Sequence, residues 1–122
     1  IVYYYADKDS NDIIIDASNF NNKKGDSEVF GISLNELGLY NIEITMKSEQ
    51  GSLSQLPLSI YYDNALKSTI TIRGTEGEWV TESRELGFIF GVNHYIKLYF
   101  GASGLDIDKV VIKFMGKGKL PF

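Results

Sequence analysis

The only tryptophan of the chain, Trp79, lies in a carboxylate-rich segment just after a glycine. Glu78 precedes it directly, and Thr81 and Glu82 follow shortly after. An indole offers a flat apolar face for the C–H groups of a sugar ring, while carboxylates accept hydrogen bonds from its hydroxyls. Large aromatic side chains are, however, mostly buried. The segment therefore predicts either a sugar platform with Glu78 beside it or a tryptophan packed at the edge of the core.

The sequence offers two candidates for catalytic residues, a single histidine and a pair of aspartates. In each case the neighbouring residues favour a structural role. The single histidine, His94, follows a turn that contains Gly91, and no motif nominates the nucleophile that a catalytic triad requires. We expect His94 to pin a turn. Asp106 and Asp108 form the carboxylate pair that a glycosidase would use, but among 16 acidic residues such pairs arise by chance. A small enzyme is the third hypothesis, and loss of hydrolysis on Asp106→Ala or Asp108→Ala with intact folding would support it.

Metal sites are restricted by the same composition. One His and no Cys exclude thiolate zinc and disfavour a histidine site. Calcium prefers carboxylate and carbonyl oxygens in loops, and Asp7-Lys-Asp9 and Asp106-Ile-Asp108 are such segments. Neither matches a linear calcium loop, so any ion would need ligands from distant segments.

Length and charge limit the remaining classes. A chain of 122 residues is one domain, and its net charge of −4 lacks the concentrated basic face that nucleic acid requires. No apolar run is long enough to cross a bilayer, so no membrane partner is expected. The chain opens on Ile1 without a signal peptide, which we interpret as a fragment of a larger protein.

Period-2 alternation in short segments, separated by Gly, Asn and Asp turns, dominates the sequence. It predicts one all-β domain over residues 1–116, an antiparallel β-sandwich (jelly roll) of eight or nine strands, and a tail or linker over 117–122. Two pairs of neighbouring strands are expected, one turning at Asp63-Asn64 and one at Gly91-Val92-Asn93. The expected strands are 2–5, 12–16, 28–34, 40–46, 58–62, 67–73, 85–90, 94–100 and 108–114.

Six stretches, in order along the chain, resemble motifs of the family 6 carbohydrate-binding modules and the related family 35 modules. They are Gly25-Asp-Ser-Glu-Val-Phe-Gly-Ile32, Leu37-Gly-Leu-Tyr40, Asp63-Asn64, Gly77-Glu-Trp79, Gly91-Val-Asn-His-Tyr-Ile-Lys-Leu98 and Leu105-Asp-Ile-Asp108. The resemblance covers residues 12 to 115, and the six stretches in this order are more specific than any one alone. It implies a jelly-roll sandwich attached to a polysaccharide-degrading enzyme.

The resemblance also implies binding residues. In these modules the tryptophan that Trp79 matches forms one wall of a sugar cleft in the loops at one end of the sandwich. The opposite wall is an aromatic residue before the Gly-Asp pair, and Phe20 is nearest, one residue out of register. The polar anchor is an asparagine in the family, and Asp106 stands in its place. We therefore expect Trp79, Phe20, Asp106 and Glu78 to bind glycan.

A structural calcium ion is the cofactor that the resemblance implies. Asp108 resembles a calcium ligand of these modules. Its N-terminal partners in the family are paired glutamates, for which Asp7, in Ala6-Asp7, is the closest match. The expected metal ligands are thus Asp108 and Asp7.

The sequence predicts a non-catalytic carbohydrate-binding module of a larger secreted or cell-surface enzyme that degrades glycans. Its expected partners are an oligosaccharide or polysaccharide and a catalytic domain in the same parent chain, with the module itself monomeric. The alternative is a structural β-sandwich that packs on a catalytic domain without binding sugar. The missing asparagine at Asp106 and the lack of a clear second aromatic wall are the reasons to keep that alternative.

Overall fold

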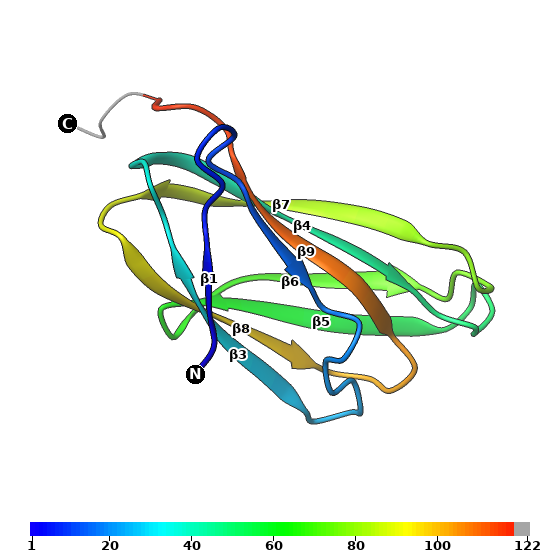
Figure 1. Ribbon diagram of the computed structural model, residues 1–122. Coiled ribbons are helices and arrows are strands. Elements are labelled where there is room, and N and C mark those ends of the chain that lie inside the picture. Colours follow the sequence, from blue (N-terminus) through cyan, green and yellow to red (C-terminus); the bar gives the residue numbers. More distant parts are fainter. Residues whose placement is uncertain (119–122) are drawn as a thin grey trace.

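The computed structural model describes residues 1–118, which form nine strands and no helix. The strands are β1 (Tyr3–Tyr5), β2 (Ile13–Asp16), β3 (Ser27–Ser33), β4 (Gly38–Lys47), β5 (Gln55–Tyr62), β6 (Ala65–Arg73), β7 (Val80–Ile89), β8 (Asn93–Phe100) and β9 (Asp106–Phe114). Figure 1 shows them in two layers. Sheet A has the order β1-β3-β8-β5-β6, and sheet B has the order β2-β9-β4-β7. The predicted all-β sandwich is confirmed.

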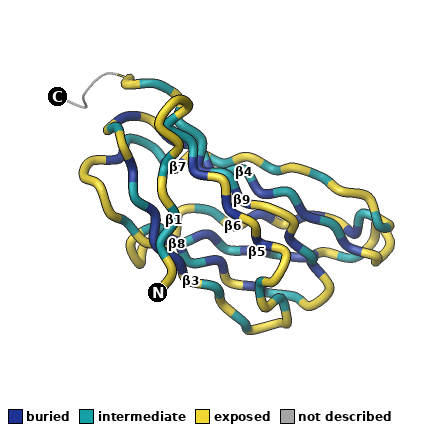
Figure 2. Tube along the Cα trace, viewed as in Figure 1, coloured by how far each residue is buried: buried dark blue, intermediate teal, exposed yellow. Residues whose placement is uncertain are grey.

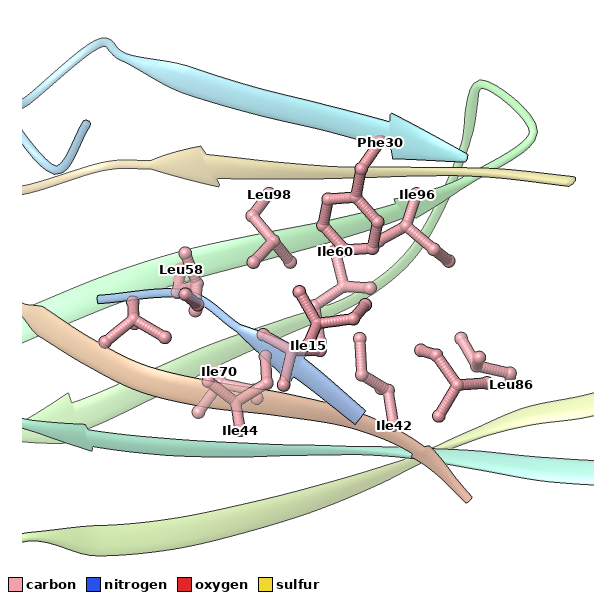
Figure 3. Packing of buried hydrophobic residues seen from close by; sticks show 14 of the residues in the cluster. Ile15, Phe30, Ile42, Ile44, Leu58, Ile60, Ile70, Leu86, Ile96 and Leu98 are labelled. Atoms are coloured by element: carbon pink, nitrogen blue, oxygen red, sulfur yellow. The ribbon is translucent and has the colours of Figure 1, made fainter. Parts of the chain in front are cut away.

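The two sheets are held together by the side chains that each strand turns inward. Along β4 every second residue from Gly38 to Met46 is buried, and the residues between them face outward. Figure 2 shows the resulting alternation of buried and more exposed positions. Side chains from both sheets, among them Ile44 and Leu58, meet in the interior in Figure 3. Each such aliphatic side chain contributes about 1.5–3 kcal/mol when fully buried.

One predicted strand pair is present and the other is wrong. β5 and β6 are neighbours that turn at Asp63 and Asn64, whose φ angles of 46° and 70° suit a tight hairpin. The strands on either side of Gly91, by contrast, do not pair: β7 pairs with β4, and β8 pairs with β3 and β5. A glycine turn between two alternating segments fits a hairpin and a crossing between sheets equally well. The alternation therefore located both strands without showing that they belong to different sheets.

Sheet B carries two β-bulges that bend its strands. In β9, Asp108 is an extra residue between Ile107 and Lys109. In β7, Leu86 is extra between Glu85 and Gly87. A bulge interrupts the alternation and increases the local twist. As a result Asp108 and Lys109, although consecutive, are both exposed.

Four connections meet at one end of the sandwich. Asn22 Nδ2 donates a hydrogen bond to the carbonyl oxygen of Leu105 at 3.0 Å, and the amide of Lys24 donates to Ser103 Oγ at 2.9 Å. These bonds join the β2–β3 connection to the β8–β9 connection. Gln50 Nε2 donates to the carbonyl oxygen of Ser103 at 3.3 Å, which adds the β4–β5 connection. The β6–β7 connection joins them because Thr75 and Gly77 form hydrogen bonds with Ser48, at the start of the β4–β5 connection.

The segment after β9 continues along β4. The amide of Met115 donates to the carbonyl oxygen of Leu39 at 2.7 Å, and the amide of Leu39 donates to that of Gly116 at 2.8 Å. Residues 119–122 of the expected tail lie outside the described residues. No helix within residues 1–118 is long and apolar enough to cross a membrane.

Strand β2 offers a matched test of the inward row. Ile15 is 0% exposed and Ile14, its neighbour, is 70% exposed. We expect Ile15→Ala to lower the free energy of unfolding by about 2–5 kcal/mol, because it leaves a cavity between the sheets. Ile14→Ala should cost no more than about 1 kcal/mol. Urea unfolding of both variants measures the difference, and equal losses would contradict the assigned facing of β2.

Candidate functional site

The residue with the clearest chemistry, Trp79, ends the β6–β7 connection, which hydrogen bonds fix to the β4–β5 connection. The amide of Gly77 donates to the carbonyl oxygen of Ser48 at 2.8 Å. Thr75 Oγ1 accepts a bond from the amide of Ser48 at 2.8 Å and donates to its carbonyl oxygen at 3.0 Å. Gly77 completes the turn with a φ of 85°, a left-handed conformation that glycine adopts at little cost. Trp79 therefore projects from a braced loop.

The indole of Trp79 is half exposed, at 49%. Lys47, on the outward row of β4, places its Nζ 4.8 Å from the centre of the indole ring. The same Nζ lies 3.6 Å from Glu49 Oε1. A cation over the ring is attracted by its π electrons and helps to hold its orientation. Trp79 is thus neither a core residue nor a freely moving surface side chain.

Trp79 borders a hollow of about 470 Å³ on the outer face of sheet B, which we call the Trp79 hollow. Its other lining residues come from β4, β7 and β9: Glu43, Thr45, Thr81, Asp108, Lys109 and Val111. Thr45 and Thr81 face each other across β4 and β7, with their hydroxyl oxygens 2.9 Å apart. The hollow combines an aromatic wall with carboxylates, hydroxyls and one ammonium group. This set can stack on a sugar ring and bond its hydroxyls.

Three of the four predicted glycan-binding residues, Phe20, Glu78 and Asp106, do not line this hollow. Phe20 packs partly buried against the core, with its ring 5.8 Å from that of Phe30. Glu78 is exposed and lines a separate hollow of about 360 Å³ on the flank where β6 and β7 approach, together with Arg73 and Glu82. The structure therefore does not set Phe20 opposite Trp79 across the Trp79 hollow.

Asp106 lies at the start of β9, opposite Lys47 in the register of sheet B. Its Oδ1 accepts a hydrogen bond of 2.9 Å from Asn22 Nδ2, so the carboxylate helps to tie the β2–β3 connection to β9. Asp106 does not line the Trp79 hollow, whereas Asp108 does. The two carboxylates, paired by their spacing in the sequence, do not share the hollow in which a catalytic pair would act.

The expected calcium ligands do not come together. Asp7 lies in the connection before β2 and Asp108 lies beside Ala17 after β2, so the two stand at opposite ends of that strand. Asp7 Oδ2 already accepts bonds from the amides of Ser10 at 2.9 Å and Asp9 at 3.1 Å. The bond from Ser10 is the main reason that the pKa of Asp7 is lowered. In the described part of the chain no three His, Cys, Asp or Glu residues gather as a metal site, so these residues do not fit a calcium ion.

His94 pins a turn, as predicted, and the turn is that of the β5–β6 hairpin at Asp63 and not the Gly91 turn beside it in the sequence. Its Nδ1 lies 2.7 Å from Asp63 Oδ2 and 2.9 Å from the hydroxyl of Tyr62. Asp63 Oδ1 accepts a further bond of 2.8 Å from the amide of Tyr95. Burial, followed by the charge of Asp63, raises the pKa of Tyr62 to about 12. This cluster fixes the β5–β6 hairpin to β8 at the end of the sandwich opposite Trp79.

Sequence reasoning missed the hollow itself. Alternation along β4 does show that Glu43 and Thr45 face outward. It does not show that β7 and β9 flank β4, because that order follows from strand pairing between distant segments. The bulge that exposes Asp108 beside Lys109 could not be predicted either, because the prediction assumes regular alternation.

Comparison with known proteins shows one curated relative and many structures of the same fold. No protein-family model matches the chain. A β-glucosidase from Ruminococcus albus is 32% identical over 102 residues, which cover 84% of this chain and 11% of that protein. The chain therefore spans about a ninth of the length of this relative.

The structural similarities decide the fold. The C-terminal family 6 carbohydrate-binding module of a laminarinase from Zobellia galactanivorans superposes with a TM-score of 0.69 at 19% identity, covering 84% of this chain and 99% of that module. A β-glucosidase from Paenibacillus barengoltzii gives a TM-score of 0.68 at 20% identity, covering 92% of this chain and 11% of that enzyme. Family 35 modules match as well. The chain has the fold of the family 6 and family 35 carbohydrate-binding modules. The fold expected from the sequence resemblance is confirmed.

The bracing of Trp79 in this module fold can be tested at Gly74. A methyl group on Gly74 would collide with the carbonyl oxygens of Gly51 and Gln50, both backbone atoms that cannot yield easily. We expect Gly74→Ala to lower the free energy of unfolding by about 1–3 kcal/mol and to shift the emission of Trp79. Gly51→Ala is the control, because nothing lies within 4 Å of its added Cβ. If both variants keep wild-type emission and stability, the loop contact is not what braces Trp79.

Proposed function

We propose that this chain is a non-catalytic carbohydrate-binding module of a larger, secreted or cell-surface enzyme that degrades glycans, and that it binds glycan against Trp79. One observation carries the proposal. A half-exposed indole, held by a braced loop, borders a hollow lined by carboxylates and hydroxyls. An indole held in place beside hydrogen-bonding groups is the combination that a sugar-binding surface uses.

Proteins of the same fold support a sugar as that ligand. A family 6 module of a lichenase from Cellvibrio mixtus, with a TM-score of 0.62 at 20% identity, was solved in complex with cellotriose. Sugar rings pair an apolar face with a rim of hydroxyls, which is the chemistry that the Trp79 hollow complements. A surface of this size should bind a short oligosaccharide weakly, because little buried area offsets the entropy of association.

Weak binding by this module would be useful to a catalytic domain in the same parent chain. The Ruminococcus albus relative is a β-glucosidase about nine times as long as the matching region, so a module of this kind occurs within such an enzyme. Anchoring an enzyme to its glycan raises the effective substrate concentration without any bond being made or broken by the module. No calcium ion takes part in this proposal.

A purely structural sandwich is the second candidate, favoured by the outer face of sheet A. Tyr5, Val29, Tyr95 and Tyr99 are exposed there. Tyr3 bonds the Tyr95 hydroxyl at 2.9 Å, which keeps two of these rings together. An aromatic face of this kind could pack on a neighbouring domain. Under this second candidate the Trp79 hollow would bind nothing.

Removing the indole separates the two candidates. We expect Trp79→Ala to weaken binding of a soluble polysaccharide by at least about tenfold, a loss of about 1.4 kcal/mol of stacking. Affinity electrophoresis and calorimetry with mixed-linkage β-glucan, xylan, laminarin and dextran, each with and without a calcium chelator, measure the effect. Tyr99→Ala, on the outer face of the other sheet, is the matched aromatic control and should bind as the wild type does. Binding lost in Tyr99→Ala but kept in Trp79→Ala would place the glycan on the wrong sheet for this proposal.

A further inference from the structure

A second hollow lies on the same outer face of sheet B as the Trp79 hollow. It measures about 310 Å³ and is lined by Leu39, Tyr40, Asn41, Glu85, Gly87 and Met115. No sequence motif pointed to it, and its residues were not among the predicted binding residues. Its position relative to Trp79 follows from the register of β4.

The two hollows adjoin along β4. The outward residues of this strand are, in order, Leu39, Asn41, Glu43 and Thr45. The first two line the second hollow, and the last two line the Trp79 hollow. Successive outward positions of one strand have no residue of that face between them. We call the combined surface the sheet B groove; from Leu39 to Thr45 it extends about 20 Å at the usual rise per strand residue.

Small side chains of β7 border the groove beside the Trp79 hollow, where Thr81 and Ser83 stand opposite Thr45 and Glu43. Farther along β7 the larger Glu85 and Phe88 stand opposite Asn41 and Leu39. The bulge at Leu86 places both Glu85 and Gly87 at the second hollow. The groove therefore runs along β4 for several outward positions, with the indole of Trp79 bordering one hollow and Met115 bordering the other.

The charge of the groove favours one class of glycan. Of the residues that line the two hollows, Glu43, Asp108 and Glu85 are carboxylates and Lys109 is a cation. The further lysines of this face are each paired with a carboxylate outside the lining, Lys47 with Glu49 and Lys113 with Asp12. Carboxylates accept hydrogen bonds from sugar hydroxyls. They repel the carboxylate or sulfate groups of an acidic sugar, and the net charge of −4 on the whole chain adds to that repulsion.

We propose that the sheet B groove binds a neutral glycan chain of several sugar units laid along β4, with one unit stacked on Trp79 and later units over Asn41 and Glu85. This inference rests on the proposed function and deepens it, since it names the charge and the length of the ligand. It differs from a cleft between two loop aromatics, because the partner surface of Trp79 is the face of sheet B.

The test is a size series on the intact chain. Probes are the oligomers, from disaccharide to hexasaccharide, of β-1,4-glucose, β-1,4-xylose and β-1,3-glucose, with oligogalacturonate as the acidic series. We expect affinity for one neutral series to rise by at least about tenfold across the sizes. Oligogalacturonate should bind at least about tenfold more weakly, and added salt should reduce that difference. Affinity that is independent of size, or tighter binding of the acidic series, would overturn the inference.

Variants at the far end of the groove separate this inference from the proposed function. We expect Asn41→Ala and Glu85→Gln to weaken binding of the hexasaccharide by about fivefold or more and to leave that of the disaccharide unchanged. Trp79→Ala should weaken both. Ser59→Ala, on the outer face of sheet A, is the control, and circular dichroism checks the folding of each variant. If Trp79→Ala matters and the far-end variants do not, the groove inference fails alone; if no probe binds, both proposals fail.

Discussion

The dry interior between two sheets is the constraint from which the rest of the molecule follows. Every long strand must give half of its side chains to that interior, as β4 does with its aliphatic row from Ile42 to Met46. The other half is released from packing and left to face water. Polar and charged side chains can therefore occupy the outward row without disturbing the core. Glu43 and Thr45 occupy outward positions directly beside fully buried neighbours.

The outward residues can form a specific binding surface only where a rigid side chain or loop stands beside them. Trp79 supplies that feature because its loop is fastened to Ser48, the single polar residue found buried among residues 1–118. Buried polar groups need partners, and the hydroxyl of Ser48 accepts a bond from the amide of Gln50. The backbone amide and carbonyl of Ser48 bond to Thr75 and Gly77, which holds the two connections together. An aromatic platform fixed in advance loses little conformational entropy when a ligand stacks on it. The bonds of Ser48 thus also help to fix the position of Trp79.

The strands were predictable from the sequence because burial on one face imposes a period of two that survives without any tertiary information. All nine appear near their expected positions, including irregular ones such as β3. The platform role expected of Trp79 rested on its polar neighbours together with the family resemblance, and the side chain is half exposed. Its companions were not predictable in the same way. Phe20 could face Trp79 only if separate loops brought the two residues together, and its ring packs beside that of Phe30 instead. Asp108 lines the hollow because of a β-bulge, and a bulge cannot be predicted from a pattern of strict alternation.

Because Phe20 does not form the expected second wall, Trp79 has no aromatic partner across the hollow among the residues that the structure describes. A cleft between two aromatic walls grips one sugar unit from both sides, and its affinity is concentrated there. Because Phe20 packs on the core, the hollow has one aromatic wall, Trp79. Thr45, Thr81 and Glu43 form the floor beside it. A floor makes weaker contacts per sugar unit than a second stacked ring does, so comparable affinity requires more units. Under our proposal, the row of polar outward residues that continues along β4 toward Asn41 supplies the hydrogen bonds to those units.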